Sequence, residues 1–278
     1  MKVNARLFAA SLALATAAAS ADPVLWFSDA RGGLGKVDIA TGTATLVGNM
    51  GATMTDIAFS PTGELFGTTF SGLYRINSST AATTFIGSHF RDLNALVFAQ
   101  DGTLFGAGTS LFTLNLATGD DTLIGSMGAS SSGDLAFVNG KMYLSAFAGG
   151  NDLLREVNTS TGASTFVGSI GRNSVFGLAS PNGVDLYGMA DSTVFAINVA
   201  TGAAGPNLAN FAGFAQTFGT TFFEEARPPI PEPSTYALMA LGLAVIGAAA
   251  RRRRSSGAER DGGCENHAPS RHLNSEPQ

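Results

Sequence analysis

The sequence predicts an all-β fold, a β-propeller of five blades with four antiparallel strands in each blade. This prediction rests on two phrases that recur about every 40 residues and on the shortage of long helical patterns. The first phrase occurs five times: LGKVDIATGTATLVG from Leu34, LYRINSSTAATTFIG from Leu73, LFTLNLATGDDTLIG from Leu111, LREVNTSTGASTFVG from Leu154 and VFAINVATG from Val194. Its Asp or Asn falls at Asp38, Asn77, Asn115, Asn158 and Asn198, with spacings of 39, 38, 43 and 40 residues.

The second phrase lies between copies of the first and keeps the same spacing. It reads DIAFSPTGELFGTT, ALVFAQDGTLFGAG, DLAFVNGKMYLSAF and GLASPNGVDLYGMA. Its turn glycines are Gly63, Gly102, Gly140 and Gly183, again 39, 38 and 43 residues apart. Apolar and polar residues alternate on either side of Thr-Gly, Asp-Gly or Asn-Gly dipeptides, which is typical of short strands joined by tight turns.

The strands can be assigned to blades by counting. With the DIAF-type strand innermost, four complete blades are expected at about 55–87, 94–125, 134–168 and 176–208. Three strands at 24–28, 34–38 and 44–48 remain at the N-terminal side, and one strand within 213–223 remains at the C-terminal side. Because three and one make a fifth blade, we expect the two ends to close the ring and remove its exposed edges. The phrasing resembles that of a broad class of secreted propellers, which implies the fold but no activity.

The N-terminal residues 1–21 have the pattern of a secretory signal peptide. Lys2 and Arg6 precede the apolar stretch 7–19, and Ala19-Ser20-Ala21 fits the small-x-small site of signal peptidase. The predicted mature domain, residues 22–226, contains no cysteine, because the chain's one cysteine is Cys264. Its stability must therefore come from packing without disulfides.

A second targeting segment lies at residues 227–254. Pro231-Glu232-Pro233 precedes the uncharged segment 236–250, and Arg251, Arg252, Arg253 and Arg254 follow it directly. We expect this segment to form a short C-terminal transmembrane helix, because its fifteen residues extend about 22 Å, less than a usual bilayer crossing, and the arginines would keep that end in the cytoplasm. The alternative is an ordinary C-terminal membrane anchor.

These three ordered parts resemble the PEP-CTERM sorting signal of Gram-negative bacteria. The resemblance implies an exported protein, handled by an exosortase at the inner membrane and then delivered to the cell surface or extracellular matrix. The chain departs from the usual pattern because the polar tail 255–278 follows the arginines. Cys264, His267 and His272 in this tail are too few for a clear zinc site, and we expect the tail to be disordered.

Charge excludes one class of partner. Residues 22–230 contain 16 acidic and 8 basic residues, a net charge of −8. Nucleic acids and anionic polymers are bound by clustered lysine and arginine, so neither is an expected partner.

The loops separate the two faces of the predicted ring. The tight turns inside the hairpins resemble one another, which predicts a plain face, whereas the connections at 29–33, 49–54, 88–92, 125–133, 148–152 and 168–174 vary in length and content. Variable loops on a rigid scaffold are the usual place for binding. They carry the candidate binding residues Arg31, His89, Arg91, Asp92, Asn151, Asp152, Arg172 and Asn173; the alternative is that these are solvated loop residues, His89 included.

Few residues suit catalysis, and we expect no cofactor and no metal. His89 is the one histidine of the exported domain, and it has neither a cysteine nor a G-x-S-x-G motif to act with. Asp56 and Asp134 occupy the same repeat position at the start of innermost strands, whereas Ala95 and Gly177 stand there in other blades. Such carboxylates suit glycoside hydrolysis or Ca²⁺ binding if they meet in the channel, and otherwise they cap strand ends by hydrogen bonding.

Three functions remain open from the sequence. The leading one is a non-catalytic surface or matrix protein that binds polysaccharide or another protein through its loop face. An extracellular glycan-active hydrolase is the alternative, indicated if Asp56, Asp134 and further acids converge within about 5–10 Å. Ice binding is the remote third, because only Thr41, Thr43 and Thr45 form a regular threonine array.

Overall fold

The computed structural model describes residues 23–89, 91–227 and 239–246. The signal peptide, the Pro-Glu-Pro sequence Pro231, Glu232 and Pro233, the cluster Arg251, Arg252, Arg253 and Arg254, and the tail with Cys264, His267 and His272 lie outside them. Residues 20–229 form one compact unit. Of the apolar segment 236–250, residues 239–246 are described and are helical. No helix in the described ranges is long and apolar enough to span a membrane.

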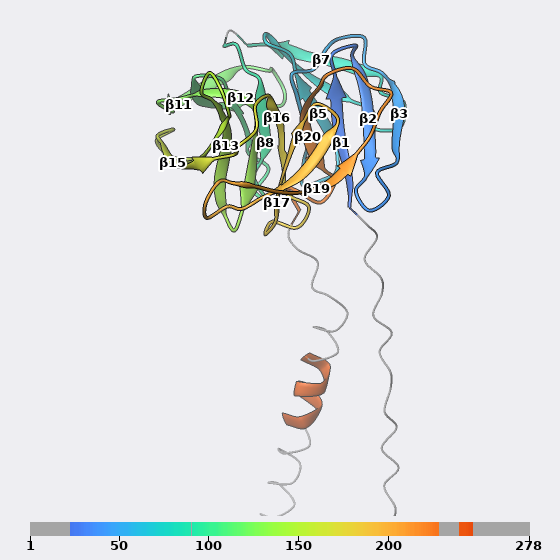
Figure 1. Cartoon of the computed structure of the whole chain (residues 1–278), viewed down its shortest axis with the longest axis vertical. Coiled ribbons are helices and arrows are strands. Elements are labelled where there is room, and N and C mark those ends of the chain that lie inside the picture. Colours follow the sequence, from blue (N-terminus) through green and yellow to red (C-terminus); the bar gives the residue numbers. More distant parts are fainter. Residues whose placement is uncertain (1–22, 90, 228–238, 247–278) are drawn as a thin grey trace, which may run out of the picture. The chain divides into compact units, whose positions relative to one another are not determined.

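The compact unit is a five-bladed β-propeller, as predicted, with four antiparallel strands in each blade (Figure 1). Blade 1 contains β20 (Thr217–Phe222), β1 (Val24–Asp29), β2 (Gly33–Asp38) and β3 (Ala44–Asn49). Blade 2 contains β4 (Asp56–Phe59), β5 (Leu65–Thr68), β6 (Gly72–Ile76) and β7 (Thr83–Ser88); blade 3 contains β8 (Ala95–Phe98), β9 (Leu104–Ala107), β10 (Ser110–Leu114) and β11 (Asp121–Ser126). Blade 4 contains β12 (Ser130–Val138), β13 (Lys141–Phe147), β14 (Leu153–Val157) and β15 (Ser164–Ser169); blade 5 contains β16 (Val175–Ala179), β17 (Leu186–Ala190), β18 (Thr193–Ile197) and β19 (Ala204–Asn210).

The two ends of the domain close the ring in blade 1. Strand β20 is the innermost strand of this blade and pairs antiparallel with β1, with Leu25 opposite Phe222 and Phe27 opposite Thr220. Three N-terminal strands and one C-terminal strand thus form one sheet, which confirms the predicted closure. Every strand of the ring finds its partners within residues 24–222, so the unit is complete in itself.

Five apolar clusters hold the blades together, one at each boundary between neighbouring blades. At the boundary of blades 2 and 3, for example, Phe66 packs with Leu96 and Phe98. The other four clusters join blades 3 and 4, 4 and 5, 5 and 1, and 1 and 2. Burying one Leu or Phe side chain stabilises a fold by about 1.5–3 kcal/mol, so these boundaries supply the packing that a disulfide-free domain needs.

The repeated first phrase is explained by a turn and a close contact. The Asn115 side chain accepts a hydrogen bond from the Ala117 N–H (2.8 Å), and Gly119 continues the turn with φ of 78°. This turn packs on Gly87 of the preceding blade, where an added Cβ would overlap the carbonyl of Thr118. The glycine that ends one copy of the phrase therefore makes room for the Thr-Gly turn of the next.

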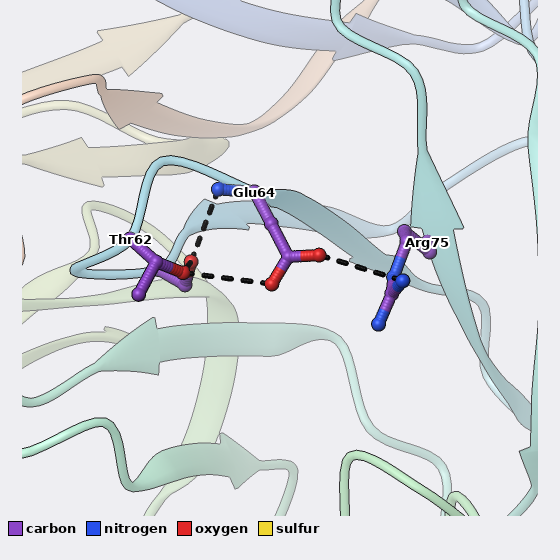
Figure 2. Close-up of polar contacts among 4 residues, drawn as sticks. Thr62, Glu64 and Arg75 are labelled. Atoms are coloured by element: carbon purple, nitrogen blue, oxygen red, sulfur yellow. Dashed lines mark hydrogen bonds and ion pairs between the residues drawn. The ribbon is translucent and has the colours of Figure 1, made fainter.

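The second phrase forms equally local turns on what we call the turn face, the end of the ring that carries turns such as those between β4 and β5 and between β6 and β7. Figure 2 shows one of them, where the Glu64 carboxylate lies between the Thr62 hydroxyl (3.5 Å) and the Arg75 guanidinium (3.4 Å), and its N–H donates to Ser60 Oγ (3.1 Å). The turn face is not entirely plain, because a pocket of about 230 Å³ separates this turn from the one at Gln100–Gly102.

Candidate functional site

The centre of the ring is closed by two carboxyl groups that share the inward-facing N–H groups of all five innermost strands. Asp56 accepts from the N–H groups of Ile57 and Leu96, and Asp134 accepts from those of Leu135 (2.7 Å), Leu178 (2.7 Å) and Thr220 (3.0 Å). These five donors occupy the same position in β4, β8, β12, β16 and β20. They have no partner strand across the channel, and a buried N–H without an acceptor is costly. The aspartates therefore act as acceptors that join the blades.

Small residues in the other three blades leave room for these two carboxyl groups. Ala95, Gly177 and Gly219 stand where Asp56 and Asp134 stand in their own blades. A Cβ added at Gly219 would overlap the Asp56 carboxyl group, and one added at Gly177 would lie 2.5 Å from a Thr220 side-chain carbon. The sequence left open why the aspartates recur in only two blades, and the reason is that the channel has space for two.

Burial raises the pKa of both carboxyl groups. The pKa of Asp56 is well above its usual range because of burial and the nearby Asp134 charge, and burial raises the pKa of Asp134 to about 8. Asp134 has more donors, including the Thr220 hydroxyl (3.1 Å), so it ionises first and accepts a hydrogen bond from protonated Asp56. Both residues are fully buried. The pair converges, as a hydrolase would require, but its carboxyl groups point at the backbone and not at a cleft.

Glu225 is a third buried acid near this pair, on the side toward the turn face. Its carboxylate accepts from the Ser180 N–H (3.0 Å), the Thr221 hydroxyl (3.0 Å) and the Phe222 N–H (3.2 Å). Burial raises its pKa, and the Asp134 charge adds to the shift. It therefore ties the end of β16 to the end of β20, next to the closing sheet.

Above the aspartates, on the face with the variable loops, the channel opens into a pocket of about 290 Å³, the mouth pocket. Each innermost strand contributes the residue just before the aspartate position: Thr55, Asn94, Gly133, Phe176 and Phe218. Thr53, Phe70 and Ser132 complete the lining. The wall therefore carries phenylalanines from blades 5, 1 and 2 (Phe176, Phe218 and Phe70), and its polar side chains are Thr53, Thr55, Asn94 and Ser132.

A second pocket of about 440 Å³, the outer pocket, adjoins the mouth pocket on this loop face. The two share Phe70 and Asn94. The rest of the outer pocket combines charged, polar and apolar groups: Arg91, Asp92, Leu93, Gly108, Thr109, Ser110, Phe112, Leu123, Ser130 and Ser131. The side chain of Phe70, 57% exposed, stands between them on the β5–β6 loop.

Two buried polar atoms in these walls have no hydrogen-bond partner. They are Asn94 Oδ1 and Ser131 Oγ. The Asn94 amide nitrogen donates to the Ser131 carbonyl (3.2 Å), which links two residues of the pocket walls. Most buried polar atoms in proteins are paired, so these two atoms are exceptions within the residues that line the pockets.

Two of the predicted loop residues are buried, so the expectation that they are exposed is wrong. His89 is 1% exposed, and its Nε2 lies 2.8 Å from the Thr68 hydroxyl. That hydroxyl donates to the Thr69 carbonyl (2.7 Å), so His89 Nε2 is the donor, and burial lowers the pKa of the ring. His89 therefore supports the β5–β6 loop that carries Phe70 and is not itself a surface group.

Asp152 is also 1% exposed. Its carboxylate accepts from the Ser132 hydroxyl (2.7 Å) and from the Val175 N–H (2.8 Å), and burial raises its pKa. The loop before β14 folds inward because Asp152 bridges β12 to the start of β16. Asp152 thus positions Ser132 in the wall of the mouth pocket.

The other predicted residues lie on the loop face but do not form one site. Arg91 and Asp92 line the outer pocket, where Arg91 pairs with Asp121 (3.4 Å). Arg172 stacks on Phe195 (4.2 Å) and donates to Asn207 (2.6 Å) at the outer edge of blade 5. Arg31, Asn151 and Asn173 are exposed and belong to neither pocket.

Sequence reasoning missed the residues that line the mouth pocket. Asn94, Phe176 and Phe218 look like ordinary strand residues when each is read alone. Aligning the repeats would have exposed them, because they share the position before Asp56 and Asp134. When the copies of a repeat carry different residues at an equivalent position that faces the axis, that position is a candidate for a binding site.

Comparisons with known proteins identify the C-terminal segment and the fold. Residues 229–254 match the PEP-CTERM protein-sorting motif. A search of the curated proteins finds no match to this sequence. A chain from work on the de novo evolutionary emergence of a symmetrical protein superposes with a TM-score of 0.52 at 15% identity, covering 71% of this chain and 97% of that one. A chain from a nidogen/laminin complex superposes with a TM-score of 0.53 at 12% identity, covering 74% and 99%.

At these identities the two structures support the fold alone, whereas the motif supports a destination. The protein is a five-bladed β-propeller with a C-terminal PEP-CTERM motif, the signature of an exported protein that is recognised by an exosortase and sorted to the cell envelope.

Proposed function

We propose that the mature protein is a non-catalytic surface or extracellular-matrix protein that binds polysaccharide through its loop face. The observation that carries this proposal is the pair of adjoining pockets, with Asn94 Oδ1 and Ser131 Oγ buried and unpaired in their walls. Both atoms accept hydrogen bonds, and sugar hydroxyls donate them.

The composition of the outer pocket favours a carbohydrate over other ligands. It combines the neutral hydroxyls of Thr109, Ser110 and Ser130 with one arginine and one aspartate, Arg91 and Asp92, and with apolar surface from Phe112. Sugar rings offer the same combination of hydroxyl edges and apolar faces. Binding protein is a weaker reading, because protein interfaces are broad and a recessed pocket of this size suits a small group.

The position of the acids supports binding over catalysis. A general acid or base must come within hydrogen-bond reach of its substrate, and Asp56 and Asp134 are fully buried beneath the mouth pocket with backbone donors on both. The alternative is an extracellular glycan-active hydrolase, favoured by the convergence of these two acids in the channel. Turnover would identify it.

The points where the chain enters and leaves the propeller support surface presentation. The Pro23 carbonyl accepts from the Ile39 N–H beside a hairpin turn, and Arg227 stacks on Phe223 (3.9 Å) next to the Gly63 turn. Both ends therefore lie on the turn face, opposite the pockets. The pockets therefore lie on the face of the propeller that the two ends of the described domain leave free.

A pull-down with insoluble and immobilised polysaccharides tests the binding proposal. Unit 20–229 is expected to be retained on at least one neutral polysaccharide, and Arg91→Ala is expected to weaken that retention. Arg31→Ala is the matched control, because Arg31 is an exposed loop arginine outside both pockets. Equal loss in both variants, or retention on none, would refute the proposal, and sugar release abolished by Asp56→Asn would favour the hydrolase.

We propose further that the motif holds an inner-membrane precursor, which exosortase processing then releases to the surface or matrix. Replacing Arg251–Arg254 with glutamine removes the cationic stop and should reduce retention of the precursor at the inner membrane. Replacing Arg31, Arg91, Arg155 and Arg172 removes the same charge elsewhere and should leave retention unchanged. Identical fractionation of the two variants would contradict this route.

A further inference from the structure

The mouth pocket is blind. The residues that follow Thr55 and Gly133 are Asp56 and Asp134, whose carboxyl groups are fully buried and close the channel. A polymer cannot thread through this floor. A ligand that enters the mouth pocket must do so with a chain end or a side group, while the rest of it leaves through the outer pocket.

The size of the mouth pocket matches one substituted ring. Its volume of about 290 Å³ is roughly twice that of the ~150 Å³ cavity that holds benzene in a protein core. The outer pocket, about 440 Å³, has room for the next unit of the same chain. Phe70 and Asn94 line both, so the two pockets are neighbours.

The lining of the mouth pocket favours a ligand that carries an apolar substituent as well as hydroxyl groups. Phe70, Phe176 and Phe218 supply an apolar wall, and Phe176 and Phe218 lie with ring centroids 5.8 Å apart. Sugar hydroxyls against such a wall would lose hydrogen bonds to water without replacement. An apolar substituent would be favoured there instead.

Asn94 lines both the apolar mouth pocket and the polar outer pocket, and its Oδ1, which is closed to solvent, meets a ligand once the Asn94 side chain turns toward the mouth pocket. This oxygen accepts no hydrogen bond, whereas the amide nitrogen of the same side chain donates to the Ser131 carbonyl. A group that matches both features has an N–H donor attached directly to an apolar cap. Among sugar substituents the acetamido group has this form, whereas an O-acetyl group lacks the donor and a free amine is cationic and lacks the cap.

We infer that the mouth pocket binds the terminal N-acetylated sugar of a glycan, with the acetamido N–H donating to Asn94 Oδ1 and the methyl group lying against Phe176 and Phe218. The adjacent sugar occupies the outer pocket, within reach of Ser131. This inference rests on the proposed polysaccharide-binding function and specifies its ligand.

The test compares sugars that differ only at this substituent. The methyl glycosides of N-acetylglucosamine, N-acetylgalactosamine and N-acetylmannosamine are titrated into unit 20–229 beside those of glucose, galactose and mannose. The hydrogen bond is worth about 2- to 12-fold in affinity and the buried methyl about fourfold. At least one N-acetylated sugar should therefore bind about tenfold more tightly than its parent, and saturation-transfer NMR should show its acetyl methyl as the proton group closest to the protein.

Two variant pairs localise the effect. Asn94→Ala should remove most of the preference for the N-acetylated sugar, whereas Asn151→Ala, an exposed asparagine of the same face, should leave it intact. Phe218→Ala should weaken the methyl signal, whereas Phe147→Ala, whose side chain is 63% exposed and outside both pockets, should not. Urea unfolding of each variant checks that the ring stays folded, and the conservative Phe218→Leu replaces Phe218→Ala if that variant unfolds.

The outcomes separate this inference from the proposed function. If all three sugar pairs bind equally, or if Asn94→Ala leaves the preference unchanged, the N-acetyl inference is overturned while polysaccharide binding stands. If unit 20–229 is retained on polysaccharide but none of the six glycosides binds, the inference is again overturned. If neither polysaccharides nor glycosides bind, the proposed function itself fails.

Discussion

Replacing Asp134 with alanine tests whether the buried acids hold the ring together. The Asp134 carboxyl group accepts from three buried N–H groups, in blades 1, 4 and 5, and from the Thr220 hydroxyl. Leaving a buried donor unsatisfied costs about 1–3 kcal/mol, so losing three acceptor contacts should destabilise the domain by about 3–9 kcal/mol. Since whole domains are stable by only about 5–15 kcal/mol, Asp134→Ala should fold marginally or not at all.

Urea unfolding of unit 20–229 measures this loss. The single tryptophan, Trp26, lies edge-on to Phe59 (5.5 Å) in the closing blade, so its fluorescence reports on the ring. Asp134→Asn keeps one acceptor oxygen and should lose less than alanine, which gives a measurable value if the alanine variant does not fold. Asp92→Ala removes an exposed aspartate of the loop face and should change stability by less than about 0.5 kcal/mol. If Asp134→Ala cost less than about 1 kcal/mol, the aspartates would not be joining the blades.

Three further predictions follow from the same centre and from the closure. Burial raises the pKa of Asp56 and of Asp134 (to about 8) above the ordinary 3.8, so the folded state keeps protons that the unfolded chain has lost. The contribution of these two acids to the free energy of unfolding is complete below about pH 4 and is lost as pH rises through about 8. Urea midpoints should therefore fall between about pH 5 and pH 9, and the decline should be flatter in Asp134→Asn. Gly219→Ala should prevent folding because its Cβ would overlap the Asp56 carboxyl group, whereas Gly150→Ala, with open space around it, should unfold at the same urea concentration as the parent; equal midpoints would contradict the steric argument. Ending the chain before Gly213 removes β20 and exposes the inner edge of β1, so light scattering should show aggregation of a truncated protein, and a stable monomer would refute the role given to the closure.

The fold could be predicted from the sequence more completely than the candidate site, for a physical reason. Blade boundaries repeat, and each copy of a phrase such as LFTLNLATGDDTLIG is independent support for the same four strands, so the strand count and the closing blade were predictable. A site in a ring arises where the copies differ. Thr55, Asn94, Gly133, Phe176 and Phe218 share one repeat position, and only their meeting around the axis makes them a pocket.

The exposure of two loop residues could not be predicted from the sequence. His89 and Asp152 were expected to be exposed because their segments are polar and vary between repeats. Whether a loop side chain points outward depends on the partners beneath it, here Thr68 for His89, and Ser132 and Val175 for Asp152. Those partners lie about 20 residues away in the sequence, where no local pattern reveals them. Glu225 was overlooked similarly, since one of its partners, Ser180, is 45 residues distant.

The closing pair of β1 and β20 also governs when the protein can fold during export. A chain that crosses the membrane from its N-terminus presents β1 first, yet the innermost strand of that blade ends at Phe222. The sorting motif begins at residue 229, only seven residues later. The ring therefore cannot be completed until translocation has almost reached the motif, and until then the N-terminal blade lacks its inner strand. Maturation of the fold and arrival of the sorting signal at the membrane become nearly simultaneous, so we expect a chain stalled before residue 217 to reach the far side of the membrane in a protease-sensitive form.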